Sequence, residues 1–361
     1  MKIGILCGGG DCPGLNAVIR GAVKTLAQTD TVVYGFLSGY KGLLEGDYIE
    51  LTRDAVRGIL PKGGTILSTT NRDNPFHYGV EENGETVYKD VSDELIAKAA
   101  ELGIDCLIVI GGDGTMAITH ELALKGLNVV GVPKTIDNDL SATDRTFGFE
   151  TAVNTATDAI DKLHTTAESH HRVMVLEVMG RDAGFIALYA GIAGGADVIL
   201  IPEIPFTIRG VLQKIEGRKK RGSAFSIVVV AEGAKIDGKK VLSGANEGNI
   251  INPEKLGGIG NAIAAALHEQ GGLETRCTVL GHLQRGGTPA PFDRILATRY
   301  GVAAAKAALA GERDVLVCLR NDKIEAVPII DSIRVLKSVD PDGELVADAM
   351  AVGISFGREE E

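Results

Sequence analysis

The sequence predicts an α/β protein built on mainly parallel sheets, and three observations support this prediction. Short apolar runs without polar alternation recur along the chain, which is typical of strands buried on both faces of a parallel sheet. Amphipathic, alanine-rich stretches lie between many of these runs. Glycine is abundant, at 47 of 361 residues, as expected where strands turn tightly into helices. We therefore expect doubly wound, Rossmann-like domains that bind ligands at the carboxyl ends of their strands.

The individual elements follow from these patterns in chain order. The apolar runs predict strands at residues 3–6, 32–36, 106–110, 129–132, 173–178, 198–201, 226–230, 277–280 and 315–319. The amphipathic stretches predict helices at residues 16–26, 92–101, 151–167, 183–193 and 259–269. Residues 234–256 are polar and rich in glycine and asparagine, so we expect them to form an excursion over the surface.

Length, charge and cysteine content limit the possible functions. A chain of 361 residues fits two domains of ordinary size. The formal net charge of −11 argues against a general nucleic-acid or membrane-surface binder. The five cysteines form an odd, scattered set, which indicates reduced thiols. With no apparent N-terminal signal and no run long enough to cross a bilayer, we expect a cytoplasmic protein.

Two glycine-rich segments follow predicted strands. Residues 8–14 (Gly-Gly-Gly-Asp-Cys-Pro-Gly) match neither a Walker loop nor a dinucleotide-binding fingerprint, and a simple strand-to-helix turn would explain them. Residues 111–115 (Gly-Gly-Asp-Gly-Thr) give a stronger signal. Glycine lets backbone amides approach an anion because no Cβ intervenes. Residues 111–115 therefore predict a phosphate-binding loop of a kinase. The same sequence also suits NAD kinases and diacylglycerol-type lipid kinases.

Residues 135–139 (Thr-Ile-Asp-Asn-Asp) narrow this prediction. Alternation turns Asp137 and Asp139 toward one side, where one carboxylate can accept a hydroxyl proton while the other helps to hold a metal ion. With Asp113 there are three carboxylates near the glycine loop, and they would repel phosphate unless a divalent cation lay between them. An Asx-rich turn that ends a strand is the structural alternative. The three carboxylates together with the preceding glycine loop favour phosphoryl transfer over this alternative.

Arginines near strand ends supply the positive charge that this chemistry needs. Arg181 follows the predicted strand 173–178, and Arg285 lies in the glycine-rich segment 281–287. Arginine suits phosphate because its planar fork can donate two parallel hydrogen bonds. Most arginines form ion pairs on the surface. Because Arg181 and Arg285 lie in glycine loops at strand ends, phosphate contacts are favoured for them.

Taken together, the motifs resemble the phosphofructokinase family over most of the chain. The matching segments, in order, are Gly9-Gly10-Asp11 with Pro13-Gly14 and Asn16, residues 111–115, residues 135–139, Met179-Gly180-Arg181, and residues 281–287 leading to Asp293-Arg294. The resemblance implies the phosphofructokinase fold. It also implies Mg²⁺-assisted transfer of a donor's terminal phosphoryl group to the 1-hydroxyl of fructose 6-phosphate.

The resemblance implies roles residue by residue. Asp137 would be the catalytic base, Arg72 and Arg181 would stabilise the transferring group, and Asp113 and Asp139 would contact the metal. The implied donor-binding residues are Gly9, Gly10, Arg72, Gly112, Asp113, Gly114, Thr115 and Lys134. The implied substrate-binding residues are Thr135, Asp137, Arg172, Met179, Gly180, Arg181, Glu232, Arg276, His282 and Arg285.

Domain organisation and self-association are also implied by the resemblance. We expect a larger donor-binding domain of residues 1–148 plus about 285–335, and a smaller sugar-phosphate-binding domain of residues 149–284 plus about 336–361. Arg172 and Arg276 match arginines that reach the substrate's 6-phosphate from a neighbouring subunit. A homodimer or homotetramer is therefore expected.

Two positions bear on the phosphoryl donor. Gly114 resembles ATP users, because a side chain there would crowd the α-phosphate of the nucleotide, whereas pyrophosphate users typically carry aspartate. Lys134 is the residue that pyrophosphate users carry, where many ATP users have glycine. Steric exclusion is the stronger constraint, so we expect ATP as the donor. The alternatives are a pyrophosphate-dependent enzyme and a catalytically silent sugar-phosphate-binding subunit.

Overall fold

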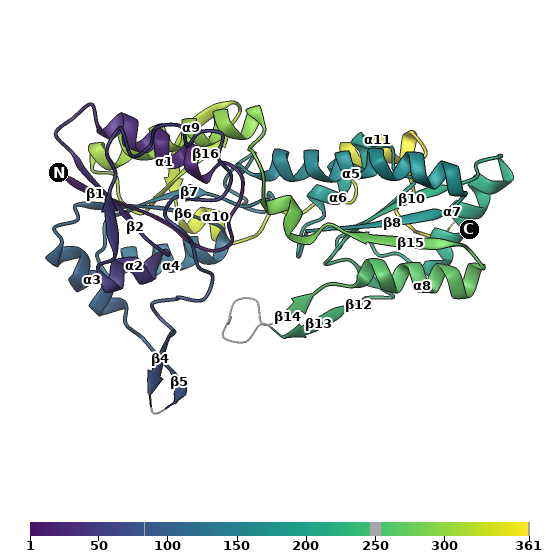
Figure 1. Ribbon diagram of the computed structural model, residues 1–361, viewed down its shortest axis with the longest axis horizontal. Coiled ribbons are helices and arrows are strands. Elements are labelled where there is room, and N and C mark those ends of the chain that lie inside the picture. Colours follow the sequence, from purple (N-terminus) through teal and green to yellow (C-terminus); the bar gives the residue numbers. More distant parts are fainter. Residues whose placement is uncertain (83, 246–253, 360–361) are drawn as a thin grey trace.

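Strands and helices alternate along the chain, and most strands gather into two sheets, each with its own covering helices (Figure 1). The computed structural model describes residues 1–82, 84–245 and 254–359. The α/β class with mainly parallel sheets is confirmed. No helix of the described residues is both long and apolar enough to cross a membrane.

The first sheet has seven strands in the order β17-β16-β7-β6-β1-β2-β3. Its strands are β1 (Lys2–Cys7), β2 (Val32–Phe36), β3 (Tyr48–Glu50), β6 (Cys106–Gly111), β7 (Val129–Pro133), β16 (Val315–Arg320) and β17 (Lys323–Pro328). The strands from β16 to β2 run parallel, whereas β17 and β3 are antiparallel edges. Every residue of β6 and β7 is buried, as their unbroken apolar sequences predict.

Helices cover both faces of this sheet and form separate apolar clusters with it. The covering helices are α1 (Leu15–Leu26), α2 (Tyr40–Glu45), α3 (Ser92–Glu101), α4 (Asp113–Leu124), α9 (Pro291–Ala310) and α10 (Ile330–Ile333). Side chains of α1 and α9 pack on one face, and those of α2, α3 and α4 on the other. This is the expected doubly wound arrangement.

The second sheet has four parallel strands in the order β15-β8-β10-β9. They are β8 (Val173–Val178), β9 (Val198–Leu200), β10 (Ser226–Ala231) and β15 (Thr275–Val279). The accompanying helices are α5 (Phe149–His170), α6 (Phe185–Ala193), α7 (Ile208–Lys220), α8 (Ile259–Gly271), α11 (Glu344–Ala351) and the short 3-10 helix η1 (Gly281–Arg285).

One strand prediction needs correction. Residues 277–280 were expected to form a strand buried on both faces, but β15 ends at Val279 and most of its side chains are not buried. The reason is its position, since β15 pairs with β8 on one side only and forms the edge of the sheet. The glycine segment 111–115 also differs from a simple loop, because Gly111 ends β6 and Asp113 begins α4.

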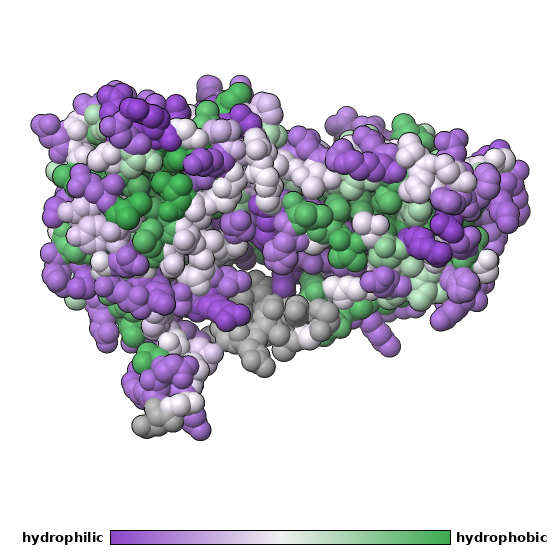
Figure 2. Space-filling model, in the orientation of Figure 1, coloured by the Kyte–Doolittle hydropathy of each residue, from purple (hydrophilic) through white to green (hydrophobic). Residues whose placement is uncertain are grey.

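We call the seven-stranded sheet with its helices the first unit and the four-stranded sheet with its helices the second unit. Short hairpins project from both. They are formed by β4 (Tyr78–Glu82) with β5 (Glu85–Lys89), β11 (Lys235–Ile236) with β12 (Lys239–Lys240), and β13 (Leu242–Ala245) with β14 (Glu254–Leu256). The β4–β5 hairpin projects below the seven-stranded unit, and its surface is mainly hydrophilic (Figures 1 and 2). The predicted excursion 234–256 contains two of these hairpins, while its residues 246–253 lie outside the described residues.

Helices α1 and α9 cross unusually closely, because two glycines meet at their contact. A Cβ on Gly301 would lie 2.2 Å from the carbonyl oxygen of Val18, and one on Gly21 would lie 2.8 Å from that of Thr298. Since α1 follows the first glycine loop and α9 follows η1, this packing brings both preceding segments together. It places Arg285 beside residues 8–14.

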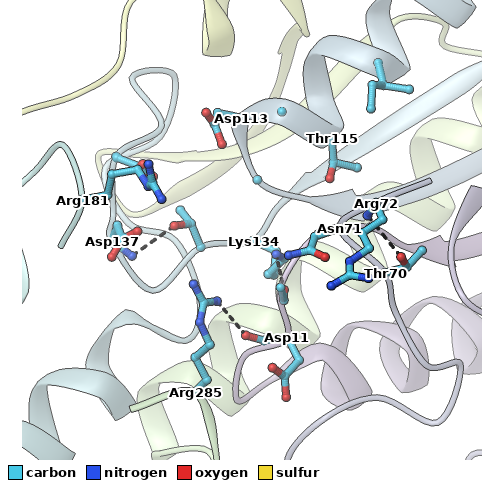
Figure 3. A pocket seen from close by; sticks show the side chains of 18 of the residues that line it. Asp11, Thr70, Asn71, Arg72, Asp113, Thr115, Lys134, Asp137, Arg181 and Arg285 are labelled. Atoms are coloured by element: carbon cyan, nitrogen blue, oxygen red, sulfur yellow. Dashed lines mark hydrogen bonds between the residues drawn. The ribbon is translucent and has the colours of Figure 1, made fainter. Parts of the chain in front are cut away.

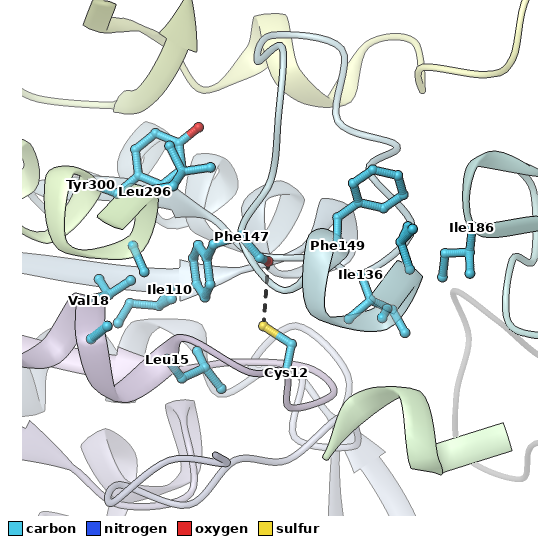
Figure 4. Close-up of a cluster of buried hydrophobic side chains, with 14 of the residues drawn as sticks. Cys12, Leu15, Val18, Ile110, Ile136, Phe147, Phe149, Ile186, Leu296 and Tyr300 are labelled. Atoms are coloured by element: carbon cyan, nitrogen blue, oxygen red, sulfur yellow. Dashed lines mark hydrogen bonds between the residues drawn. The ribbon is translucent and has the colours of Figure 1, made fainter. Parts of the chain in front are cut away.

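The apolar core continues beneath the segment that carries Asp137. Phe147 and Cys12 are fully buried, and the thiol of Cys12 donates to the Phe147 carbonyl at 3.6 Å (Figure 4). Ile136 and Phe149 extend the same cluster toward Ile186 in the second unit. All five cysteines are described and none forms a disulfide, as predicted.

Candidate active site

The carboxyl ends of β1, β6 and β7 open into one pocket of about 370 Å³. Because these strands are parallel neighbours in the sheet, the segments that follow them meet at the same edge. The second unit closes the other side. The pocket is lined by Gly8, Gly9, Gly10, Asp11, Tyr40, Thr70, Asn71, Arg72, Asp73, Asn74, His77, Gly112, Asp113, Gly114, Thr115, Ile118, Lys134, Thr135, Asp137, Asp139, Met179, Arg181, Asp182, Glu232, His282 and Arg285.

Two glycines make room for the start of α4. A Cβ on Gly8 would lie 2.6 Å from Cγ2 of Thr115, and one on Gly111 would lie 2.3 Å from Cβ of the same threonine. The side chain of Thr115 therefore packs over the ends of β1 and β6 where only glycine fits. Gly112, the N-cap residue of α4, has no side chain to accept from the first amides of the helix. These amides and the helix dipole favour an anion in the pocket.

Lys134 lies at the centre of the glycine-lined wall (Figure 3). Its side chain is 4% exposed, and its ammonium donates to the carbonyl of Gly10. A Cβ on Gly9 would lie 3.4 Å from the Nζ atom. Burial lowers the pKa of Lys134, and no carboxylate pairs with it directly among the ion pairs of the described residues. A phosphate group would supply the missing counter-charge.

Asp137 and Asp139 have shifted pKa values for a common reason. Burial raises the pKa of Asp137 to about 6, with Glu232 and Asp113 adding to the shift and Arg285 opposing it. Burial also raises the pKa of Asp139 to about 7, and the charges of Asp137 and Asp113 contribute. One oxygen of each carboxylate, Oδ1, is buried without a hydrogen-bond partner. Both groups are thus ready to accept a proton or a cation.

The second unit contributes arginines and a glutamate to the opposite wall. Arg285 of η1 donates from Nη1 to the carbonyl oxygen of Asp11 at 3.1 Å, and a Cβ on Gly10 would lie 2.7 Å from that nitrogen. Arg181 and Asp137 both line this pocket (Figure 3). Burial raises the pKa of Glu232, whereas the charges of Arg181 and Arg285 lower it. Positive charge therefore comes to the pocket from both units.

Most of the residues predicted for the site lie in this pocket, but three do not line it. Gly180 forms the turn between Met179 and Arg181, with a φ of 137° that favours glycine. Arg172, which precedes β8, and Arg276 of the edge strand β15 both pair with Glu274, at 2.6 and 3.4 Å. These two arginines are not part of the pocket within this chain.

Tyr40, His77 and Asp182 also line the pocket, although no sequence motif described above indicated them. Tyr40 follows the end of β2, where Ser38 and Gly39 both have positive φ. The short Ser-Gly turn after a predicted strand was the available signal. His77 stacks on Tyr88 of the β4–β5 hairpin, with ring centroids 4.1 Å apart. The Asn-Gly pair between β4 and β5, a typical hairpin sequence, was the available signal for that contact.

Comparisons with known proteins agree with the site. The family described as Phosphofructokinase matches residues 2–308. The chain is 52% identical to ATP-dependent 6-phosphofructokinase 2 of Clostridium perfringens, with 98% of each chain covered. It is 48% identical to a pyrophosphate–fructose 6-phosphate 1-phosphotransferase of Amycolatopsis methanolica, covering 95% of this chain and 97% of the relative.

A solved structure gives the same result. Phosphofructokinase of Pichia pastoris in the T-state is similar with a TM-score of 0.79 and 31% identity. The similarity covers 98% of this chain and 36% of the yeast chain, so this chain spans about a third of the length of that relative.

Proposed function

The chain belongs to the phosphofructokinase family, and from this membership we propose that it is an ATP-dependent 6-phosphofructokinase. It transfers the γ-phosphoryl group of ATP to the 1-hydroxyl of fructose 6-phosphate, giving fructose 1,6-bisphosphate and ADP. The observation that carries the proposal is Asp137, a half-buried carboxylate whose Oδ1 atom is buried without a partner, in a pocket lined by glycines on one side and by arginines on the other.

Asp137 is the general base in this proposal. Its carboxylate accepts the proton of the sugar 1-hydroxyl as the hydroxyl oxygen attacks the γ-phosphorus and the bond to ADP breaks. The pKa of about 6 suits this task, because the group is ionised near neutral pH and still basic enough to take the proton.

The cations of the pocket stabilise the transferring group. Arg72 and Arg181 balance the negative charge that spreads over the phosphoryl oxygens, and Lys134 attracts the donor phosphates. The donor lies along Gly9, Gly10, Gly112, Gly114 and Thr115, which all line the pocket. Positioning and charge carry most of the rate in phosphoryl transfer, and each well-placed donor contributes roughly 2.7–4 kcal/mol to the transition state.

A divalent cation, Mg²⁺ in this proposal, fits the carboxylates that are present. The buried Oδ1 atom of Asp139 has no hydrogen-bond partner, and Asp113 lies in the same pocket. Among the described residues, no group of three or more His, Cys, Asp or Glu side chains could hold a metal alone. This suits Mg²⁺, which is usually held by one or two carboxylates together with phosphate oxygens. When bound, the ion neutralises charge on the donor phosphates.

The sugar phosphate lies against the second unit. Met179, Glu232, His282 and Arg285 form its binding wall in this proposal, Thr135 faces it from the end of β7, and Gly180 supplies the turn between Met179 and Arg181. Arg172 and Arg276 belong to the 6-phosphate site of a neighbouring subunit, which makes the enzyme a homodimer or homotetramer. The place of Arg276 on the edge strand β15, with Arg172 beside it through the shared Glu274, supports this role, because an edge strand is accessible to a second copy.

The two sheets support a division into the expected domains. Residues 1–148 with about 285–335 contain all strands of the seven-stranded sheet and form the proposed donor-binding domain. Residues 149–284 with about 336–361 contain the four-stranded sheet and α11 and form the proposed sugar-phosphate-binding domain.

A donor comparison tests the proposed function. Purified protein is supplied with fructose 6-phosphate, Mg²⁺ and either ATP or pyrophosphate, and fructose 1,6-bisphosphate is measured in a coupled assay. We expect ATP to be the better donor. Strong turnover with pyrophosphate and negligible turnover with ATP would favour the second candidate, a pyrophosphate-dependent enzyme, for which Lys134 is the specific observation. Binding of fructose 6-phosphate without turnover from either donor would indicate the silent subunit.

A further inference from the structure

The turn between the two key carboxylates depends on the side chain of one buried residue, Asn138. Asn138 has a φ of 55°, in the left-handed region that asparagine tolerates better than most residues. It is 3% exposed. The turn sets the directions in which Asp137 and Asp139 leave the chain. Whatever holds Asn138 therefore affects the geometry of both carboxylates.

The Oδ1 atom of Asn138 accepts hydrogen bonds from the far end of its own loop and from a segment distant in the sequence. The amide of Thr146 donates to it at 3.1 Å, and the ammonium of Lys337 donates at 3.2 Å. Thr146 in turn donates from Oγ1 to the carbonyl oxygen of Thr135 at 2.7 Å. The loop from Thr135 to Thr146 is thus closed on itself, with Lys337 as the one charged donor to Asn138.

Lys337 uses all three of its ammonium donors on this loop. Besides Asn138, it donates to the carbonyl oxygens of Thr143 and Asp144, both at 3.0 Å. An ammonium has three donors and no acceptor, so this set satisfies it completely. Charge-assisted hydrogen bonds are about twice as strong as neutral ones, and here they join the two arms of the loop.

The backbone around Lys337 reinforces the contact. Its amide donates to the carbonyl oxygen of Asp139 at 2.7 Å, and Leu336 forms an antiparallel bridge with Leu140. Two residues further on, the amide of Val339 donates to Glu203 Oε1 at 2.8 Å. Glu203 also accepts from the amide of Gly184, at 2.9 Å to the same oxygen, just after the segment that carries Arg181. The chain from 336 to 339 therefore ties the Asp137 loop to the second unit.

We propose that Lys337 is a positioning residue for Asp137 and Asp139, acting through the Oδ1 atom of Asn138. The inference rests on the proposed function for its kinetic consequences, but the contact itself concerns the folded chain. Lys337 does not line the pocket and does not contact the reacting atoms. It holds the turn from which both carboxylates project.

Lys337→Met tests the proposal, because it keeps an unbranched apolar side chain and removes the charge and the donors. We expect kcat to fall by roughly 10- to 100-fold, since small misplacements of reacting groups have effects of this size. The KM values for ATP and fructose 6-phosphate should change by less than about 3-fold, because the pocket walls stay in place. Lys306→Met, at an exposed lysine on α9, is the matched control and should behave like the unchanged protein.

Amide hydrogen exchange gives a readout that needs no turnover. In Lys337→Met, peptides that cover residues 135–147 should exchange faster, while peptides that cover β6 should be unchanged. Unchanged exchange over 135–147 would overturn the proposal. If the unmodified protein has no kinase activity, the proposed function fails, and the exchange result still decides the role of Lys337.

A double-mutant cycle tests the route through Asn138. Asn138→Gly keeps access to the positive φ but removes the Oδ1 acceptor, and it also serves if Lys337→Met does not fold. If Lys337 acts through Asn138, the double variant should lose little more kcat than the more damaging single variant. If the fold-loss of kcat in the double variant equals the product of the losses in the two single variants, the residues act independently and this route is overturned.

Discussion

The pocket and the exposed edge at β15 both carry predicted phosphate-binding cations, but the two regions are built differently. In the pocket, Lys134 follows the wholly buried strand β7, and Arg285 is held against Asp11. At the edge, Arg276 lies on β15, a strand with mostly exposed side chains, and it shares Glu274 with Arg172, which precedes β8. Exposed pairs are screened and contribute little, whereas buried charges keep a fixed geometry. One chain therefore assembles the proposed phosphoryl-transfer centre, while we propose that the edge arginines act against a second copy.

Replacing the proposed base should give the largest effect and test the pocket side of this comparison. Asp137→Asn should lower kcat by roughly 10²- to 10⁴-fold, because no group remains to accept the hydroxyl proton. Calorimetry should still detect binding of fructose 6-phosphate. Asp158→Asn, at an exposed carboxylate on α5 that pairs with Lys162, is the control. An unchanged kcat in Asp137→Asn would remove this residue from the mechanism.

Gly114→Asp tests whether the glycine wall selects the donor. A carboxylate in the first turn of α4 would approach the donor phosphates, so kcat/KM for ATP should fall by roughly 100-fold. Activity with pyrophosphate should fall less, because the α-phosphate and nucleoside are absent. Gly217→Asp is the matched control, since a Cβ in that helix meets its nearest neighbour only at 3.7 Å. ATP turnover equal to that of the unchanged protein would refute the steric argument.

Arg172→Met and Arg276→Met test the edge side of the comparison. Each should raise KM for fructose 6-phosphate by roughly 10- to 100-fold, because a hydrogen bond to a charged group is lost, while kcat changes little. Arg299→Met, which removes a surface pair with Asp322, is the control. The KM for ATP should stay the same in all three variants.

Mixed oligomers make this third prediction sharper. If the edge arginines serve a neighbouring site, co-assembly of Asp137→Asn subunits with Arg276→Met subunits should regain activity, because some sites receive both intact groups. Neither variant alone should show that activity at low fructose 6-phosphate. Mixtures that merely average the two variants would indicate that the arginines act within their own chain.

The pH dependence should give the smallest effect. The pKa of Asp137 in the ligand-free protein is about 6, so kcat/KM should fall as the pH drops through this value and the base becomes protonated. The stability of the folded protein changes with pH in the opposite direction. Because the pKa is raised from 3.8 in the folded state, the folded protein binds more protons between these values, and the free energy of unfolding decreases as the pH rises through that window.

Asp137→Asn should remove this decrease. At pH 8 the ligand-free variant should be more stable than the unchanged protein by on the order of 1–3 kcal/mol, measured by calorimetric Tm across pH 4–8. Equal pH slopes of Tm in the two proteins would contradict the burial of a charged Asp137.

Local patterns were enough to predict much of the fold and of the pocket. Unbroken apolar runs predicted β6 and β7, and their ends positioned the loops with Asp113 and Asp137. The edge position of β15 was not predicted, because an apolar run does not say how many neighbours a strand will have. Tyr40 was missed for a related reason, since its hydroxyl contacts Thr119 of α4, which is distant in the sequence.

The sequence by itself determined the strand ends, the glycines and the carboxylates, because chain-local spacing fixes which side chains leave a strand end together. Only the tertiary structure decided which of these ends meet. The close crossing of Gly21 and Gly301 brings Arg285 to the first glycine loop, and the reach of Lys337 to Asn138 spans nearly two hundred positions. Such contacts depend on the order of strands in a sheet and on helix packing, which local spacing does not encode.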